Sequence, residues 1–143
     1  MTERQLTVVT DLRDTPLSVD EALDAVRHPR AGAVALFVGT VREHDSGRDG
    51  VTTLDYSAHP DALEHLSRIA DEVGQEDQVH GVYAVHRVGP LAVGDLAVVC
   101  AVSAEHRAEA FAGGRRLIEE LKARVPIWKR QEFGDDGHTW VGL

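Results

Sequence analysis

The chain has 143 residues, of which 43% are hydrophobic and 27% are charged, so we expect one globular domain spanning residues 1–143. Fifteen Lys and Arg against 24 Asp and Glu give a net charge of −9. That sign is opposite to the one typical of proteins that bind nucleic acids or anionic membranes non-specifically. Only 5% of the residues are aromatic, which leaves few rings to stack on bases and further disfavours an RNA-binding domain.

The single cysteine, Cys100, lies in the apolar run 97–102 and is expected to be a buried strand residue. One thiol cannot form an intrachain disulfide or a multi-cysteine zinc site. The first residues lack the basic start and long apolar stretch of a signal peptide, and no apolar run reaches the roughly 18 residues of a membrane span. We therefore expect a cytoplasmic protein.

The hydrophobic pattern predicts strands and helices in mixed order. A strand at 6–9 is followed by a helix from Ser18, which forms a capping-box pattern with Glu21, to about Arg27. The segment 33–38 is apolar on both faces and is expected to be a central, buried strand. A polar loop at 44–50 precedes a strand at 51–56, a helix at 61–72, and strands at 79–88 and 96–102.

The longest periodic segment, 104–124, predicts a helix with Ser103 as its N-cap and Pro126 just past its end. Gly113 and Gly114 lie in its middle, which predicts close packing against another backbone. Strands at 127–133 and 138–141 complete the chain. Because strands and helices do not alternate strictly, we expect the α+β class with a mixed, largely antiparallel sheet. The core stripe of the long helix is expected to consist of Ala108, Phe111, Ile118 and Leu121.

Positive charge is concentrated near the C-terminus. Residues 104–132 hold seven basic and five acidic residues, a net +2, so the rest of the chain sums to −11. This pattern can indicate solvated helix faces with i,i+4 ion pairs, or a site for an anionic ligand. Lys122 borders the buried face of the helix, and Lys129 follows Pro126, where the chain is expected to fold back. Two neighbouring ammonium groups can bind an anion, stabilise an oxyanion or transfer protons.

Two further segments could contact an anion. Thr40, Val41 and Arg42 follow a predicted strand, where backbone N–H groups and an arginine can meet a phosphate. His106 and Arg107 lie in the first turn of the long helix, where the helix dipole favours anions. The eight histidines show no metal-ligand spacing, so no metal site is expected, and no motif for a nucleotide or a serine nucleophile is present.

Four segments together resemble the large, catalytic subunit of molybdopterin synthase: residues 32–42, 86–89, 103–107 and 121–130. The resemblance runs from about Thr7 to Val141. It implies an α/β-hammerhead-like fold of the α+β class and a central homodimer. Each protomer of that family binds a small ubiquitin-like sulfur-carrier subunit, giving a heterotetramer of two plus two chains. The implied enzyme is a sulfurtransferase of molybdenum cofactor biosynthesis that needs no cofactor of its own.

The resemblance also implies roles for individual residues. In that family the carrier's C-terminal Gly-Gly tail, as a thiocarboxylate, transfers sulfur twice to cyclic pyranopterin monophosphate, forming the dithiolene of molybdopterin. Lys122 and Lys129 match the catalytic pair. Residues matching substrate-binding segments are Thr40, Val41, Arg42, His106, Arg107, Arg130 and Gln131.

Helix geometry adds one inference about the assembly. Arg107 and Lys122 are 15 residues apart, about 22 Å along a continuous helix, so one small ligand cannot contact both within one chain. We therefore expect His106 and Arg107 to complete the pocket of the partner protomer. The alternative to an enzyme is a non-catalytic dimeric α+β module that binds a carrier protein or a phosphorylated ligand. Turnover by a Lys122→Ala variant discriminates between the two.

Overall fold

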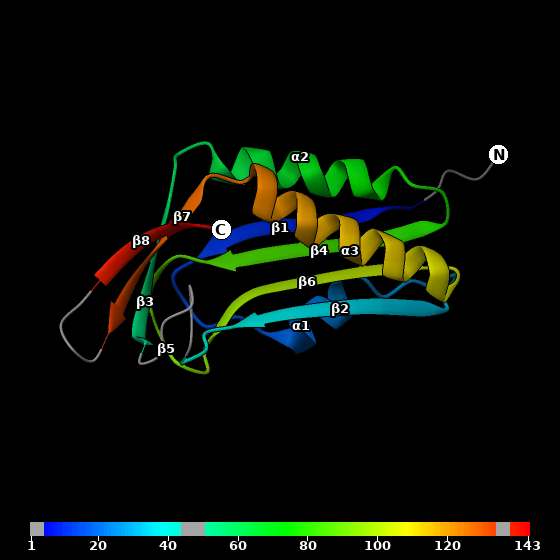
Figure 1. Ribbon diagram of the computed structural model, residues 1–143. Coiled ribbons are helices and arrows are strands. Elements are labelled where there is room, and N and C mark those ends of the chain that lie inside the picture. Colours follow the sequence, from blue (N-terminus) through cyan, green and yellow to red (C-terminus); the bar gives the residue numbers. More distant parts are fainter. Residues whose placement is uncertain (1–4, 44–50, 134–137) are drawn as a thin grey trace.

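The computed structural model describes residues 5–43, 51–133 and 138–143, and the loop expected at 44–50 lies outside them. Within these described ranges the fold has two four-stranded sheets and three helices (Figure 1). The first sheet has the order β1-β4-β6-β2 and the second has the order β5-β3-β7-β8. The strands are β1 (Thr7–Arg13), β2 (Ala33–Thr40), β3 (Val51–Ala58), β4 (Val79–Arg87), β5 (Gly89–Ala92), β6 (Leu96–Ala104), β7 (Ile127–Phe133) and β8 (His138–Gly142).

Strand pairing is mixed in the first sheet and antiparallel in the second. Among the strands that the structure describes, only β1 and β4 pair in parallel. The helices α2 (Ala62–Gly74) and α3 (Arg107–Arg124) lie on one face of the first sheet, and α1 (Val19–Ala25) lies on the other (Figure 1). The expected α+β class with largely antiparallel pairing is confirmed, and the strands divide into two sheets. No helix among the described residues is long and apolar enough to span a membrane.

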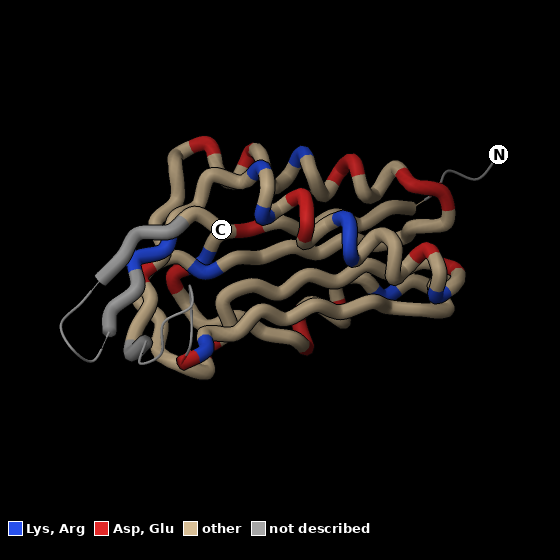
Figure 2. Tube along the Cα trace, in the orientation of Figure 1, with Lys and Arg blue, Asp and Glu red and all other residues tan. Residues whose placement is uncertain are grey.

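The middle of the first sheet forms the core. Strand β6 carries no charged residue, and Figure 2 shows its trace without Lys, Arg, Asp or Glu between the charged residues of the helices and of the second sheet. Cys100 on this strand is buried, as expected, and burial raises the pKa of its thiol to about 12. Apolar side chains on one face of the sheet pack against α2 and α3, and a smaller cluster on the other face packs against α1.

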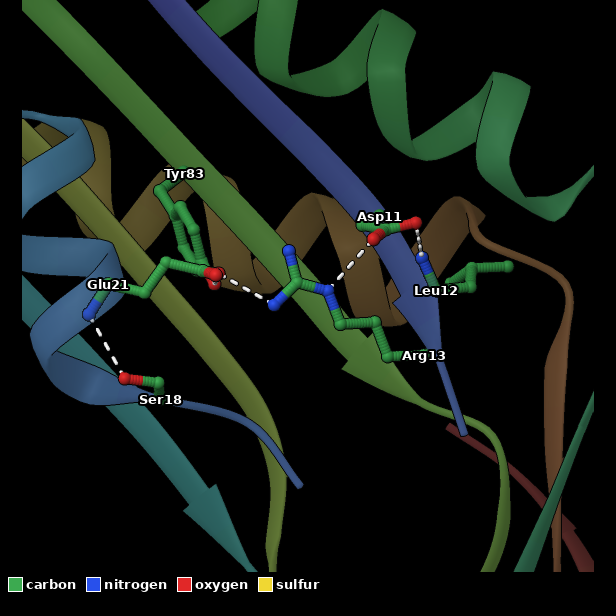
Figure 3. A network of polar contacts seen from close by, with 6 residues as sticks. All are labelled: Asp11, Leu12, Arg13, Ser18, Glu21 and Tyr83. Carbon is green, nitrogen blue, oxygen red and sulfur yellow. Dashed lines mark hydrogen bonds and ion pairs between the residues drawn. The ribbon is translucent and has the colours of Figure 1, made fainter. Parts of the chain in front are cut away.

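A polar network fixes α1 to the sheet (Figure 3). Ser18 caps the helix as expected, because its hydroxyl accepts a hydrogen bond of 3.1 Å from the Glu21 N–H. The Glu21 carboxylate contacts residues outside α1. It accepts a hydrogen bond from the hydroxyl of the buried Tyr83 and another, of 2.7 Å, from the Arg13 guanidinium. Arg13 also donates to Asp11 at 2.8 Å. These bonds hold the pKa of Glu21 below its usual range.

Two sequence expectations about β2 and α3 are wrong. The strand β2 lies at the edge of its sheet, and the large apolar side chains of Val34, Leu36 and Phe37 are exposed. The N-cap of α3 is His106, because β6 continues to Ala104 and occupies the residues expected to start the helix. Sequence alone could not place β2 at the edge of the sheet, because an apolar strand has the same sequence pattern whether its own chain or another chain covers it.

The expected core stripe of α3 is half correct. Ile118 and Leu121 are buried, but Ala108 is exposed and 67% of Phe111 is accessible to solvent. The two mid-helix glycines pack closely, as expected, although against side chains rather than backbone. A Cβ at Gly113 would lie 3.0 Å from Val102, and one at Gly114 would lie 3.2 Å from Ala35. The absence of side chains at these two positions therefore allows α3 to lie close to the sheet.

The Tyr83–Glu21 contact predicts a stability that depends on pH. We expect Tyr83→Phe to lower the free energy of unfolding by about 1 kcal/mol at pH 7, because it removes a hydrogen bond to a charged group that is partly exposed. The contribution is complete above the ordinary glutamate pKa of about 4.3 and is lost as the pH falls through the lowered pKa of Glu21. Urea titrations from pH 7 down to the acid limit of the fold measure this, and a loss that stays constant over that whole range contradicts it.

Candidate functional site

A cavity of about 310 Å³ lies at the junction of the two sheets and the end of α3. It is large enough for one small organic ligand. Three cationic side chains, Arg42, Lys122 and Lys129, contribute to its wall. Apolar and uncharged groups complete the lining: Phe37, Gly39, Thr40, Leu54, Tyr56, His86, Ala97, Val98, Ile118, Leu121 and Leu143.

The two lysines reach the cavity from either side of a chain reversal. The helix α3 ends at Arg124, and Pro126 separates it from β7, as the sequence predicted. The carbonyl of Pro126 accepts a hydrogen bond of 3.0 Å from the His59 N–H, which ties the reversal to the connection between β3 and α2. Lys122 is exposed at the end of α3 and Lys129 is half-buried on β7. The reversal thus brings both ammonium groups to one cavity.

The segment after β2 supplies the third cation. Thr40 and Arg42 line the cavity, whereas Val41 is 3% exposed and belongs to the core. The backbone of Val41 is fixed on both sides, because its N–H donates to the Asp95 carbonyl and its carbonyl accepts from the Gly94 N–H. Of this expected segment, Thr40 and Arg42 therefore line the cavity, and the buried Val41 fixes the backbone between them.

Neighbouring residues on β7 face opposite sides of the second sheet. Lys129 pairs with Tyr56 of β3, and both line the cavity. Arg130 pairs with Asp55 and is not among the lining residues, as expected when side chains alternate along a strand. Gln131 pairs with Leu54 through the backbone, and its side chain lies outside the part of the structure that is described.

His106 and Arg107 lie far from the cavity in the same chain. The helix α3 runs unbroken from Arg107 to Arg124, so Arg107 and Lys122 are about 22 Å apart along its axis. Neither residue of the pair at the start of α3 lines the cavity. Both are exposed, and the preceding Glu105 is held by His80 at 3.1 Å and by Arg30 at 3.4 Å. The start of α3 is thus fixed and accessible at the other end of the molecule.

Sequence reasoning assigned no role to two cavity residues, His86 and Tyr56. Their rings meet edge to face with centroids 4.9 Å apart. Burial and the positive charge of Lys122 lower the pKa of His86 to about 4, against a partly opposing hydrogen bond to the Arg87 carbonyl. His86 is therefore neutral at physiological pH. The sequence pattern around His86 gave little indication of this position, because all residues of β4 are buried and no alternation of apolar and polar residues marks the face toward the cavity.

The cavity offers cations and hydrogen-bond donors rather than metal ligands. Among the described residues, no group of three His, Cys, Asp or Glu side chains could hold a metal ion. Cys100 lies within the core and is not among the lining residues. The chemistry that the described part of the chain can supply is anion binding, oxyanion stabilisation and proton transfer by lysine.

Burial of the thiol predicts that it is inert in the folded protein. We expect Cys100 to react with a thiol reagent at pH 8 at least about 100-fold more slowly in the native state than in urea, because burial restricts access and raises the thiol pKa to about 12. Mass spectrometry of samples quenched over time measures the two rates. Comparable rates in both states would show that the core opens readily or that the thiol is accessible.

Fold and cavity together define an α+β protein with a cationic cavity large enough for a small ligand. The MoaE protein family model matches residues 12–124, and the chain belongs to this family. Molybdopterin synthase catalytic subunit 1 of Mycobacterium tuberculosis is 48% identical over 134 residues, covering 92% of this chain and 88% of that protein. The catalytic subunit of Halalkalibacterium halodurans is 39% identical, covering 92% and 83%.

Solved structures agree with this assignment. Molybdopterin synthase from Staphylococcus aureus superposes with a TM-score of 0.82 at 33% identity, covering 99% of this chain and all of the other. Subunits 1 and 2 of the molybdopterin-converting factor from Helicobacter pylori form a complex, and a chain of it matches in fold with a TM-score of 0.69 at 20% identity. The resemblance found in the sequence is confirmed, and the relatives are catalytic subunits, in agreement with the expectation of an enzyme.

Proposed function

We propose that this protein is the catalytic subunit of a molybdopterin synthase, transferring sulfur from the thiocarboxylate of a small carrier subunit to cyclic pyranopterin monophosphate. The observation that carries the proposal is the cavity shared by Lys122, Lys129 and Arg42 in a chain of net charge −9. Both reactants are anions, one a phosphate and the other a thiocarboxylate, and a cationic cavity attracts both.

The cytoplasmic location of the protein stays a prediction.

The cavity residues suit this chemistry without a protein thiol. In each transfer the sulfur displaces an oxygen substituent from a carbon of the pyranopterin, so a carbon–sulfur bond replaces a carbon–oxygen bond. Water then cleaves the acyl–sulfur bond, and the carrier tail leaves as a carboxylate. Negative charge develops on the acyl oxygen during this cleavage, and a neighbouring ammonium group stabilises it. Lys122 and Lys129 fit this role and can transfer the protons, whereas the buried Cys100 does not reach the cavity.

The carrier subunit is proposed to insert its C-terminal tail into this cavity. A Gly-Gly tail is narrow enough to enter a space of about 310 Å³, and its terminal anion would then lie near the lysines. The Helicobacter pylori relative, which is a complex of two different subunits, supports a partner of this kind. The sulfur atom therefore comes from the partner chain.

We also propose that the protein forms a homodimer through an apolar face of β2 and α3. This face, here called the β2–α3 face, consists of the exposed Phe37 and Phe111 on the α3 side of β2, and Val34 and Leu36 are exposed on the opposite side of the same edge strand. Phe37 also lines the cavity, so the face is continuous with the site. The edge position of β2 leaves backbone groups available for a second strand.

Two-fold symmetry would bring the start of one α3 to the cavity of the other protomer. Ala33 at the start of β2 pairs with Ala104, just before α3 begins, and Thr40 at the end of β2 lines the cavity. If two copies of β2 pair antiparallel, the start of one lies beside the end of the other. His106 and Arg107 of one protomer would then approach the cavity of its partner, which supports their proposed role in substrate binding.

Removing one cavity lysine tests the enzymatic role. We expect Lys122→Ala to reduce dithiolene formation by at least about 100-fold, because it removes a group for proton transfer and charge stabilisation, while the affinity for the carrier changes little. Formation of the dithiolene from thiocarboxylated carrier and pyranopterin measures the rate. The matched control is Arg68→Ala, which removes an exposed positive charge on α2 away from the cavity and should leave the rate unchanged. Undiminished transfer by Lys122→Ala would falsify the catalytic role of Lys122, whereas a wild-type protein that binds the carrier but forms no dithiolene would support a binding module.

Mixed dimers test the shared site. We expect Arg107→Glu and Lys122→Ala homodimers each to be inactive, and an equimolar mixture exchanged to equilibrium to recover about a quarter of the wild-type rate. Half of the dimers are then mixed, and one of the two cavities in each mixed dimer retains both residues. The rate per protomer after exchange is the measurement, and mass spectrometry of the intact dimers confirms the mixing. No recovery in confirmed mixed dimers contradicts the arrangement.

A further inference from the structure

His86 occupies the end of β4 where the two sheets meet. The residue is 2% exposed, and its ring forms part of the cavity wall. The Tyr56 ring packs edge-on against it, with centroids 4.9 Å apart, so the imidazole has a fixed position. A polar ring held rigidly in the wall of a cavity is a candidate contact for whatever enters that cavity.

One ring nitrogen of His86 is already engaged by the backbone. Nδ1 lies 2.7 Å from the Arg87 carbonyl oxygen. A carbonyl oxygen can only accept, so Nδ1 carries the proton and donates it. In the neutral ring, Nε2 then has a lone pair and no proton. The backbone therefore selects the tautomer in which Nε2 is a hydrogen-bond acceptor.

Nε2 has no hydrogen-bond partner among the described residues. It is also not one of the side-chain atoms that lack both a hydrogen-bond partner and contact with solvent. Because the ring lines the cavity, this nitrogen is accessible from the cavity. The neighbouring Lys122, Lys129 and Arg42 are donors only and cannot accept a hydrogen bond. His86 thus adds a neutral acceptor beside three cationic donors.

We propose that His86 is a ligand-binding residue whose Nε2 accepts a hydrogen bond from an N–H group of a bound reactant. The inference rests on the proposed function and adds to it. Cations recognise the phosphate and the thiocarboxylate, and an acceptor is needed for the N–H groups of the same reactants. Such a group is present both in the peptide bonds of the Gly-Gly tail and in the pterin ring. Removing the acceptor would leave a desolvated N–H unpaired in the complex.

Two amide substitutions separate a ligand contact from a structural role. The side-chain nitrogen of asparagine reaches the place of Nδ1 and can still donate to the Arg87 carbonyl. The side-chain oxygen of glutamine reaches the place of Nε2 and can still accept from a ligand. We expect His86→Asn to weaken binding of one reactant about tenfold or more, and His86→Gln to stay within about threefold of the wild type.

The measurements are calorimetric titrations of each variant with the carrier ending in an ordinary Gly-Gly carboxylate and, separately, with cyclic pyranopterin monophosphate. Weaker binding of the carrier alone assigns the N–H to the tail, and weaker binding of the pterin alone assigns it to the ring. The reverse order, with the asparagine variant normal and the glutamine variant impaired, shows that His86 only supports the fold and overturns the inference. Equal binding by both variants and the wild type overturns it as well.

Two controls keep the outcome interpretable. His86→Phe retains an aromatic ring against Tyr56 without any acceptor, so it should bind as weakly as the asparagine variant and replaces that variant if it does not fold. Thermal unfolding and near-ultraviolet circular dichroism verify the fold of each protein. A wild-type protein that forms no dithiolene refutes the proposed function itself. A wild-type protein that does form it, with an asparagine variant that binds normally, refutes only the role of His86.

Discussion

The candidate site depends on the reversal of the chain between α3 and β7. Pro126 ends the helix, and its carbonyl is held by the His59 N–H at 3.0 Å, so the direction of the returning strand is fixed by the second sheet. Lys129 lies seven positions after Lys122, and an extended chain of that length would hold the two residues more than about 20 Å apart. The reversal instead places both in the wall of one cavity.

Electrostatics and structure support each other at this cavity. Most of the arginines on α2 and α3 are paired with glutamates, as Arg116 is with Glu76 and Arg124 is with Glu72. These ion pairs lie on solvated faces of the helices, which was one of the two interpretations of the charge pattern in the sequence. The cations Arg42, Lys122 and Lys129 line the cavity, and His86 beside them stays neutral because of its burial. A local cationic site therefore exists within an acidic protein.

The sequence was informative where one chain alone determines the structure. The periodicity of α3, the apolar strand β6 and the Ser18 cap were predicted because they depend on local pattern. The exposure of Phe111 and the edge position of β2 were not, because hydrophobicity does not reveal which molecule covers a surface. Lys122 and Lys129 could be selected from their relation to Pro126. His86 could not be given a role, since its contact with the cavity depends on pairing between distant strands.

The glycine pair of α3 has a consequence for the site beyond packing. Gly113 and Gly114 set how closely the helix approaches β6 and β2, and Lys122 lies on the same rigid helix two turns further on. A larger residue at either position would raise the helix from the sheet and shift the lysine, although it touches no part of the cavity. Substitutions at Gly113 or Gly114 therefore change the position of Lys122 and, through it, the turnover rate of a member of the family.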